Sequence, residues 1–206
     1  MRITGHKRVL LGRHGETTSN RDGLIMGQSD SPLTEKGLRT AAEMAGRLEQ
    51  EKIGTIFSSP LGRAARTAKI YADRLGLPVA SRDVMAELSC GRWEGKSRRQ
   101  VLGSSVALRK DWDEIPPGGE SCADGEARVA PLISEIRSLD VQAAVLVVGH
   151  ASVNRVFLKL WLGLHPGVAI RIACPHDTVY VLKDAELISA MSAAGKIVPN
   201  LLFEED

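Results

Sequence analysis

The stretch that decides the fold covers residues 8–17 and reads Arg8-Val9-Leu10-Leu11-Gly12-Arg13-His14-Gly15-Glu16-Thr17. Its first half is a short apolar run closed by a glycine, a pattern typical of a buried strand that leads directly into a loop. Ligands in open α/β sheets bind beyond the carboxyl ends of the strands. Arg13 and His14, placed directly after such a strand, therefore predict a functional site at that edge of the sheet.

Two later segments repeat the arrangement of a strand followed by polar side chains. Residues 145–149 form the clearest buried strand, which runs through His150 into an amphipathic helix predicted for 152–162. A strand predicted for 53–58 is followed by Arg63 in the first turns of the next helix. Together with the first strand end, these segments bring together two imidazoles and two guanidiniums, a set that suits a dianionic phosphate. The start of the helix after the second histidine would add backbone N–H donors and the positive end of the helix dipole.

The remaining elements also alternate between helix and strand. We expect a helix from Thr34 to about residue 50, and a second helix capped by Ser59 with Pro60 at its first position and Gly76 at its end. A short extended segment over 77–82 and one short helix near 97–110 should follow. A capping box of Ser121 and Asp124 should open a helix that is kinked at Pro131, and two late strands are expected over about 169–173 and 178–182. The sequence shows no internal repeat and no linker. This order predicts one α/β domain over residues 1–206, a three-layer sandwich with a mostly parallel sheet and helices on both faces.

Composition narrows the classes of function. With 43% hydrophobic residues, 25% charged residues and a net charge of +2, the chain is not of the disordered type. Twenty-seven basic against 25 acidic residues are too balanced for a general binder of nucleic acid or of an anionic membrane, so an anionic partner must be recognised by a few placed cations. Cys90, Cys122 and Cys174 are too far apart for a disulfide framework or a zinc site. The first apolar run, residues 9–11, is too short for a signal peptide and no run approaches a membrane span, so we expect a cytoplasmic protein.

Six ordered motifs carry a family resemblance. They are Leu11-Gly12-Arg13-His14-Gly15-Glu16-Thr17 with Asn20, Ser31-Pro32-Leu33-Thr34-Glu35-Lys36-Gly37, Ser58-Ser59-Pro60-Leu61-Gly62-Arg63-Ala64 with Thr67-Ala68, Glu87-Leu88 with Gly91-Arg92-Trp93-Glu94-Gly95, Pro117-Gly118-Gly119-Glu120-Ser121, and Val147-Val148-Gly149-His150. Over about residues 8 to 185 they resemble the histidine phosphatase superfamily, also called the phosphoglycerate mutase-like family. In size the chain is similar to the phosphatase branch, which includes α-ribazole phosphatases and broad-specificity phosphatases. The resemblance implies the phosphoglycerate mutase-like fold.

The resemblance also implies a role for each matching residue. His14 would be the nucleophile that becomes a phosphohistidine, and neighbouring cations would keep its imidazole neutral near pH 7. The phosphoryl oxygens would be held by Arg13, Asn20, Arg63, His150 and Ala151. Glu87 would protonate the leaving oxygen and then activate water, a role for a carboxyl that can hold a proton near neutral pH. No metal and no other cofactor is implied, because the arginines would neutralise the charge, and the expected partner is a small phosphorylated metabolite.

Several positions leave questions open. Ala151 stands where relatives commonly carry glycine, which should have a modest effect, and Cys90 replaces a bulkier residue. The segment 174–178 stands where relatives often carry Asn or Gly with a small hydroxyl residue, and His176 within it is an outside candidate for the pocket wall. Glu94 lies in the same loop as Glu87 and competes with it for the role of the acid.

A basic cluster consists of Arg92, Lys96, Arg98 and Arg99. It is either a solvated loop or a rim that attracts a second anionic group of the substrate.

Three functions are consistent with these residues. The first is a metal-independent phosphomonoesterase acting through His14, and the second is a cofactor-dependent phosphoglycerate mutase using the same residues. Mutases of the family are typically longer, so a chain of 206 residues favours hydrolysis. The third is a catalytically silent phosphate-binding module, against which the presence of His14, Glu87 and His150 argues. The sequence does not name the phosphate ester, and it leaves the oligomeric state open, with a homodimer as one option.

Overall fold

One seven-stranded mixed sheet forms the centre of the molecule, with the strand order β3-β2-β4-β1-β5-β6-β7. The computed structural model describes residues 7–103, 108–139 and 143–203. The strands are β1 (Arg8–Arg13), β2 (Ile53–Ser58), β3 (Val79–Ser81), β4 (Ala144–Gly149), β5 (Thr178–Lys183), β6 (Glu186–Ser192) and β7 (Ile197–Val198). The helices are α1 (Thr18–Arg21), α2 (Glu35–Leu48), α3 (Gly62–Leu75), α4 (Arg98–Leu102), α5 (Cys122–Ser138), α6 (Ala151–Leu162) and α7 (Pro166–Ala169), with short 3-10 turns at Glu49–Glu51, Asp83–Met85 and Gly91–Trp93.

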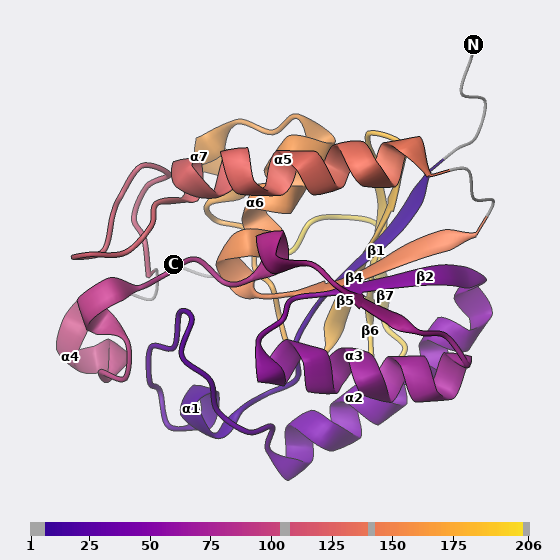
Figure 1. Ribbon diagram of the computed structural model, residues 1–206, viewed down its shortest axis with the longest axis horizontal. Coiled ribbons are helices and arrows are strands. Elements are labelled where there is room, and N and C mark those ends of the chain that lie inside the picture. The colour runs from indigo at the N-terminus through magenta and orange to yellow at the C-terminus, as the bar shows by residue number, and fades with distance from the viewer. Residues whose placement is uncertain (1–6, 104–107, 140–142, 204–206) are drawn as a thin grey trace.

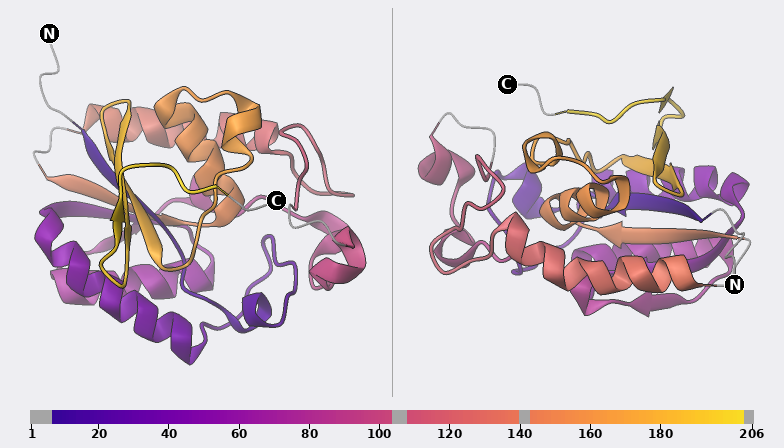
Figure 2. Two further views of the ribbon diagram at one scale, coloured as in Figure 1. Left: turned by 180° about the vertical axis from the view of Figure 1, so that it is seen from behind. Right: turned by 90° about the horizontal axis from the view of Figure 1, so that it is seen from above.

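The sheet is covered on both faces, as the order of elements predicts. Successive strand residues point to opposite faces of a sheet, so each strand feeds two separate cores. Val9 and Leu11 of β1 pack in the cluster formed with α5 and α6. Leu10, between them, packs in the cluster formed with α2 and α3. Figures 1 and 2 show the resulting three layers, which confirm a single α/β domain with helices on both faces of the sheet.

The parallel half of the sheet positions the loops that carry the polar motifs. Strands β3, β2, β4 and β1 pair in parallel, whereas β5, β6 and β7 are antiparallel, so the antiparallel share is larger than expected. The N–H of His14 donates to Gly149 O at 3.0 Å, and the N–H of Ser59 donates to Val148 O at 2.9 Å. The carboxyl ends of β1, β2 and β4 therefore lie side by side, at the end of the sheet where Figure 1 shows α1 and α4.

Most predicted elements are present with small changes at their ends. The helices predicted from Thr34 and from Ser121 begin at their expected caps, and Ser121 and Asp124 form the predicted capping box. Pro131 lies inside α5, which continues to Ser138. The strands predicted near 53–58, 145–149 and 178–182 are β2, β4 and β5.

The helix predicted to start at Ser59 begins later. The N-cap of α3 is Leu61 and its first residue is Gly62. The hydroxyl of Ser59 instead accepts from the Leu61 N–H at 3.2 Å and contacts the ring of His150. A carboxylate oxygen of Asp30 accepts from the Arg63 N–H at 3.2 Å, which supplies the cap from a distant segment.

Two further predictions were wrong in extent or type. The helix predicted near 97–110 is limited to α4, which ends at Leu102 because the next residue, Gly103, has a positive φ. Residues 104–107 lie outside the described residues. The strand predicted over 169–173 does not form; Pro166 at a helical first position and His165, which accepts from the Gly167 N–H, instead start the short helix α7. The sheet is completed by β6 and β7, which the sequence patterns did not predict.

Among the described residues no helix combines the length and the apolar character that crossing a membrane requires.

Candidate active site

His14 lies in the loop after β1 with its two ring nitrogens in different environments. Nδ1 is 2.8 Å from the carbonyl oxygen of Gly15. Because a carbonyl oxygen can only accept, Nδ1 must carry a proton, which leaves a lone pair on Nε2 of the neutral ring. Burial, followed by the proximity of His150, Arg13, His176 and Arg63, holds the pKa of His14 well below its usual value of 6.5. The ring is therefore neutral near pH 7 and can act as a nucleophile through Nε2.

His150 packs beside His14, with ring centroids 5.0 Å apart. Its Nε2 is 2.7 Å from Ser59 Oγ, and that hydroxyl already accepts from the Leu61 N–H. The buried Ser59 O–H needs an acceptor, and among the described residues Nε2 is the acceptor within reach. The hydroxyl therefore donates to Nε2, and the single proton of the neutral ring sits on Nδ1. Within the described residues this Nδ1 is buried without a hydrogen-bond partner. Burial, then Arg63 and Arg13, hold the pKa of His150 well below 6.5, in agreement with a neutral ring.

Arg63 is a buried cation that contacts His14 directly. Its Nε donates to His14 Nε2 at 3.2 Å. Its other nitrogens are anchored from behind: Nη1 donates to Ser29 O at 2.5 Å and to Asp30 Oδ1 at 3.3 Å, and Nη2 donates to Gly27 O at 2.7 Å. The guanidinium thus presents one edge to His14, and the loop formed by residues 27–30 holds the opposite side.

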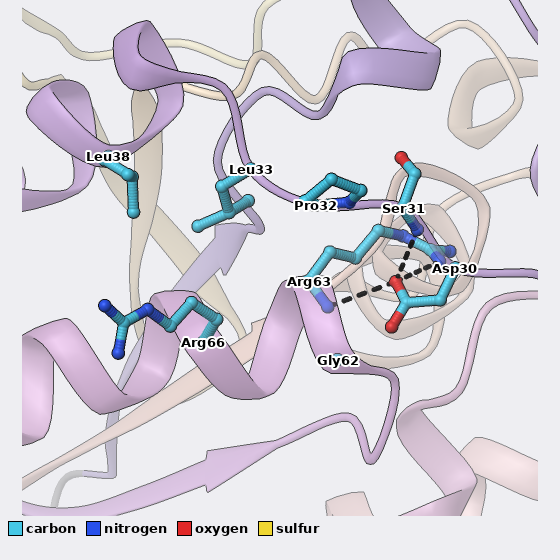
Figure 3. Close-up of a pocket in the computed structure, with 8 residues that line it drawn as sticks. All are labelled: Asp30, Ser31, Pro32, Leu33, Leu38, Gly62, Arg63 and Arg66. Atoms are coloured by element: carbon cyan, nitrogen blue, oxygen red, sulfur yellow. Dashed lines mark hydrogen bonds and ion pairs between the residues drawn. The ribbon is translucent and has the colours of Figure 1, made fainter.

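One cavity, of about 480 Å³, lies on the side of Arg63 that is bonded to Asp30. Figure 3 shows Asp30 joined to both Arg63 and Ser31, with Leu33 and Leu38 on the facing wall and Arg66 farther along α3. This cavity contains neither histidine of the candidate site among its lining residues.

Arg13 is held by the segment between α7 and β5. Its Nη1 donates to Cys174 O at 3.0 Å, whereas its Nε is buried without a partner among the described residues. Burial lowers the pKa of Arg13 to about 10, which still leaves the guanidinium charged near pH 7. A fixed cation with an unpaired buried N–H next to His14 is suited to an anionic ligand.

The cavity in front of His14 has a volume of about 200 Å³ and a positive lining. Its lining residues are Arg13, His14, Asn20, Leu24, Ile25, Met26, Gly27, Arg63, Glu87, Cys90, Arg98, Leu108, Ala151, Ser152 and Arg155. Four of them are arginines, and Glu87 is the one acidic residue in this lining of described residues. The predicted residues Arg13, His14, Asn20, Arg63, Glu87 and Ala151 are brought together here. His150 is not among the lining residues, but its ring packs against that of His14.

Glu87 occupies the position that the sequence suggested for a phosphate at the start of α6. Its Oε1 accepts from the N–H groups of Leu88 at 2.9 Å and Val153 at 3.0 Å, and its Oε2 accepts from the Ser152 N–H at 3.1 Å. Two donors of the α6 N-terminus are therefore used by the chain's own carboxylate, an arrangement that the helix dipole favours. Within the described residues the Ala151 N–H has no acceptor, so it is the donor of this helix start that a ligand can still use.

Glu94 joins two loops beside the cavity through hydrogen bonds to their backbone. It accepts hydrogen bonds from the N–H groups of Gln28 at 3.1 Å, Ser29 at 2.9 Å and Cys90 at 3.1 Å, and it also accepts from the Ser29 hydroxyl. Burial raises the pKa of Glu94, but the hydrogen bonds from Ser29, Gln28 and Cys90 outweigh it and lower this pKa below 4.5. Glu94 thus joins the loop that anchors Arg63 to the loop that carries Glu87, and Glu87 alone of the two lines the cavity.

Asn20 is partly engaged by Thr17, and the basic cluster reaches the cavity through one member. The Oδ1 of Asn20 accepts from the N–H of Thr17 at 3.2 Å and from its hydroxyl at 2.9 Å, so a ligand would meet the amide Nδ2. Of the basic cluster, Arg98 is half-buried and lines the cavity. The other members, Arg92, Lys96 and Arg99, are exposed.

Sequence reasoning missed three polar residues of this region. Arg155, which is 7% exposed, lines the cavity and donates from Nε to Ile172 O at 2.7 Å. It lies four residues after Ala151 on α6, so the helical period could have placed both on one face. Arg109 is buried and donates to the carbonyl oxygens of Ser89 and Glu120, which no sequence spacing indicated. Ser59 was predicted only as a cap.

No group of three or more His, Cys, Asp or Glu side chains in the described part of the chain could hold a metal ion. In the described lining of the cavity, the positive charges are those of the arginines.

Comparison with known proteins decides the family. The sequence model described as "Histidine phosphatase superfamily (branch 1)" matches residues 9–186, which include every motif from Arg13 to His150. The chain belongs to the histidine phosphatase superfamily. It is 35% identical over 170 residues to a protein of Yersinia enterocolitica named probable phosphoglycerate mutase GpmB, covering 80% of this chain and 79% of that one.

Solved structures with similar folds include two phosphatases. A mycobacterial glucosyl-3-phosphoglycerate phosphatase in complex with VO3 is 28% identical, covers 84% of this chain and 90% of its own, and has a TM-score of 0.76. The alpha-ribazole phosphatase of Shigella flexneri, 24% identical, covers 97% of this chain and 99% of its own with a TM-score of 0.73, a likeness of fold. These matches confirm the phosphoglycerate mutase-like fold that the resemblance implied, and they support an enzyme of the phosphatase or mutase type.

Proposed function

We propose that this histidine phosphatase superfamily member is a phosphomonoesterase that hydrolyses a small phosphate ester, without a metal ion, through a phosphohistidine on His14. The observation that carries the proposal is the state of the His14 ring. Nδ1 is tied to Gly15 O, so Nε2 holds a lone pair, and it lies against the Arg63 guanidinium at the floor of a positively charged cavity.

In the first step, Nε2 of His14 attacks phosphorus while the bond between phosphorus and the ester oxygen breaks. The transferring group carries negative charge on its oxygens, and fixed donors that meet this charge lower the barrier. The donors we assign are Arg13 Nε, the edge of Arg63 that faces His14, His150 Nδ1, Asn20 Nδ2 and the Ala151 N–H. Glu87 supplies the proton that the leaving alkoxide takes.

In the second step, water attacks phosphorus and the bond to His14 Nε2 breaks. Glu87, now a carboxylate, accepts a proton from that water, and inorganic phosphate leaves with the enzyme restored. Both oxygens of Glu87 are held by backbone N–H groups, and Oε2 accepts only one of these bonds. A lone pair of Oε2 is therefore available for the proton in both steps.

A second candidate is a cofactor-dependent phosphoglycerate mutase. It is favoured by the relatives named probable phosphoglycerate mutase at 35% identity. A mutase would return the phosphoryl group from His14 to a second oxygen of the substrate instead of to water.

One assay separates these candidates. A panel of phosphate esters including 3-phosphoglycerate is incubated with and without 2,3-bisphosphoglycerate, and both inorganic phosphate and 2-phosphoglycerate are measured. The proposal expects phosphate release that is unchanged by EDTA, with no 2-phosphoglycerate. Bisphosphate-stimulated 2-phosphoglycerate formation would support the mutase, and absence of any turnover would support a silent module.

A further inference from the structure

His176 contacts His14 but takes no part in the proposed transfer of the phosphoryl group. Its ring centroid lies 5.1 Å from that of His14. It belongs to the segment that joins α7 to β5, and it is not one of the described residues that line the cavity. Its hydrogen bond is to His14, so we expect its effect on the site to act through that residue.

The contact is a hydrogen bond with a defined direction. His176 Nδ1 lies 2.7 Å from the backbone carbonyl oxygen of His14. The carbonyl oxygen accepts, so Nδ1 of His176 carries the proton. Burial and then Arg13 lower the pKa of His176 to about 3, although the bond to His14 and the proximity of Glu16 raise it. The ring is therefore neutral near pH 7, and its single proton is the one donated to His14.

The peptide unit between His14 and Gly15 is held at both ends by side chains from distant segments. Its carbonyl accepts from His176, and its N–H donates to Thr67 Oγ1 on α3 at 3.0 Å. The next carbonyl along the chain, Gly15 O, is the acceptor that fixes the proton on Nδ1 of His14. The orientation of this peptide unit therefore sets the position of the acceptor on which the nucleophilic tautomer of His14 depends.

We propose that His176 is a positioning residue: by donating from Nδ1 to the His14 carbonyl, it holds the backbone that keeps His14 protonated on Nδ1 and open at Nε2. This inference rests on the proposed role of His14 as nucleophile. The same segment also accepts from Arg13 Nη1 through Cys174 O, so it contacts both Arg13, the last residue of β1, and His14, which follows it.

Two substitutions of His176 test whether the N–H donor at the Nδ1 position matters, rather than the volume of the ring. In His176→Asn the amide nitrogen takes the place of Nδ1, whereas in His176→Gln it takes the place of Nε2, where the His14 carbonyl is out of line. We expect kcat of His176→Gln to fall about 10- to 100-fold, because small misplacements of reacting groups cost rates of this order, with KM changed by less than about twofold. We expect His176→Asn to keep kcat within about threefold of the unchanged protein.

A spectroscopic signature tests the same point without turnover. Long-range ¹H–¹⁵N NMR at pH 7 should show His14 as the Nδ1–H tautomer in the unchanged protein and in His176→Asn, and as a mixture of tautomers in His176→Gln. Equal kcat and equal ring spectra in the two variants, or equal losses in both, would overturn the proposal, as would unfolding of His176→Asn at 25 °C. If the unchanged protein forms no phosphohistidine, the proposed function fails, while the ring spectra still decide whether His176 sets the tautomer.

Discussion

Arg63 donates from Nε to Nε2 of His14 across 3.2 Å, so a fixed cation lies on the atom that would attack phosphorus. The arginine is 3% exposed and is anchored through its other nitrogens to the loop formed by residues 27–30. Before a substrate binds, this contact satisfies the Nε2 lone pair. When a phosphoryl group enters, the N–H donors on this edge of the guanidinium can bind its oxygens.

Replacement of Arg63 by lysine should therefore be costly although the charge is kept. An ammonium cannot reach the carbonyl oxygens of Gly27 and Ser29 and the ligand at the same time. We expect kcat/KM to fall about 100-fold or more, as for the loss of a donor to developing charge. Arg66→Lys, at an exposed position one turn along α3, is the matched control and should change kcat/KM less than about twofold. Similar losses in the two variants would argue against a special role of Arg63.

Glu87→Gln should separate esters by the quality of their leaving groups. The amide keeps one oxygen that can accept from a backbone N–H group at the start of α6, but its NH2 group cannot accept from the other N–H group and cannot supply the proton. Hydrolysis of alkyl phosphates should slow by about 100-fold or more, and hydrolysis of aryl phosphates, whose leaving groups need no proton, should slow much less. Steady-state rates on a matched alkyl and aryl pair provide the measurement. Equal slowing of both would exclude Glu87 as the general acid.

Glu94→Gln should give the opposite pattern, because Glu94 is bonded to loop backbone rather than facing the cavity. Removing the charge weakens several hydrogen bonds, so the free energy of unfolding should fall by about 1–3 kcal/mol in urea titrations. Both ester classes should slow by a similar factor. A selective loss on alkyl phosphates in this variant would assign the acid to Glu94 instead.

The lowered pKa values of three buried histidines predict that the fold loses stability in mild acid. The pKa values of His14 and His150 lie well below 6.5 and that of His176 is lowered to about 3. Below pH 6.5 the unfolded chain therefore binds protons that the folded chain does not, so the stability present above pH 6.5 decreases as the pH falls below it. Each such group contributes up to about 1.4 kcal/mol per pH unit.

The free energy of unfolding, measured in urea at pH 7.5 and at pH 5.5, gives this loss of stability. Both pH values lie above the range in which most carboxylates titrate. His176→Asn removes one of the three buried imidazoles, so the difference between the two pH values should shrink by about a third. A free energy of unfolding that is equal at both pH values would contradict the burial of neutral histidines.

The strand ends were predictable from sequence because local pattern and chemistry agree there. The apolar run before Arg13 and the one before His150 form neighbouring parallel strands, and the residues after them meet as expected. The start of α3 was misplaced because Ser59 resembles a helix cap in sequence, yet its hydroxyl is used by His150. Such competition between a local cap and a distant partner leaves no mark in the sequence.

Tertiary contacts explain the other differences. The sequence suggested that the N–H groups after His150 await a phosphate, but Glu87, 63 residues earlier, accepts two of them. The strand expected over 169–173 is absent, because Pro166 and His165 start a helical turn just before it. His176 had no supporting motif, and only the fold brings it to the His14 carbonyl.

The most direct test of the central claim is to trap the covalent intermediate. The protein is mixed with a reactive phosphate ester, quenched within milliseconds in base, where phosphohistidine is stable, digested, and analysed by tandem mass spectrometry. We predict a phosphoryl group on His14 in the unchanged protein and none in His14→Asn, with loss of turnover in that variant. A phosphoryl group on another residue, or full turnover by His14→Asn, would contradict the account.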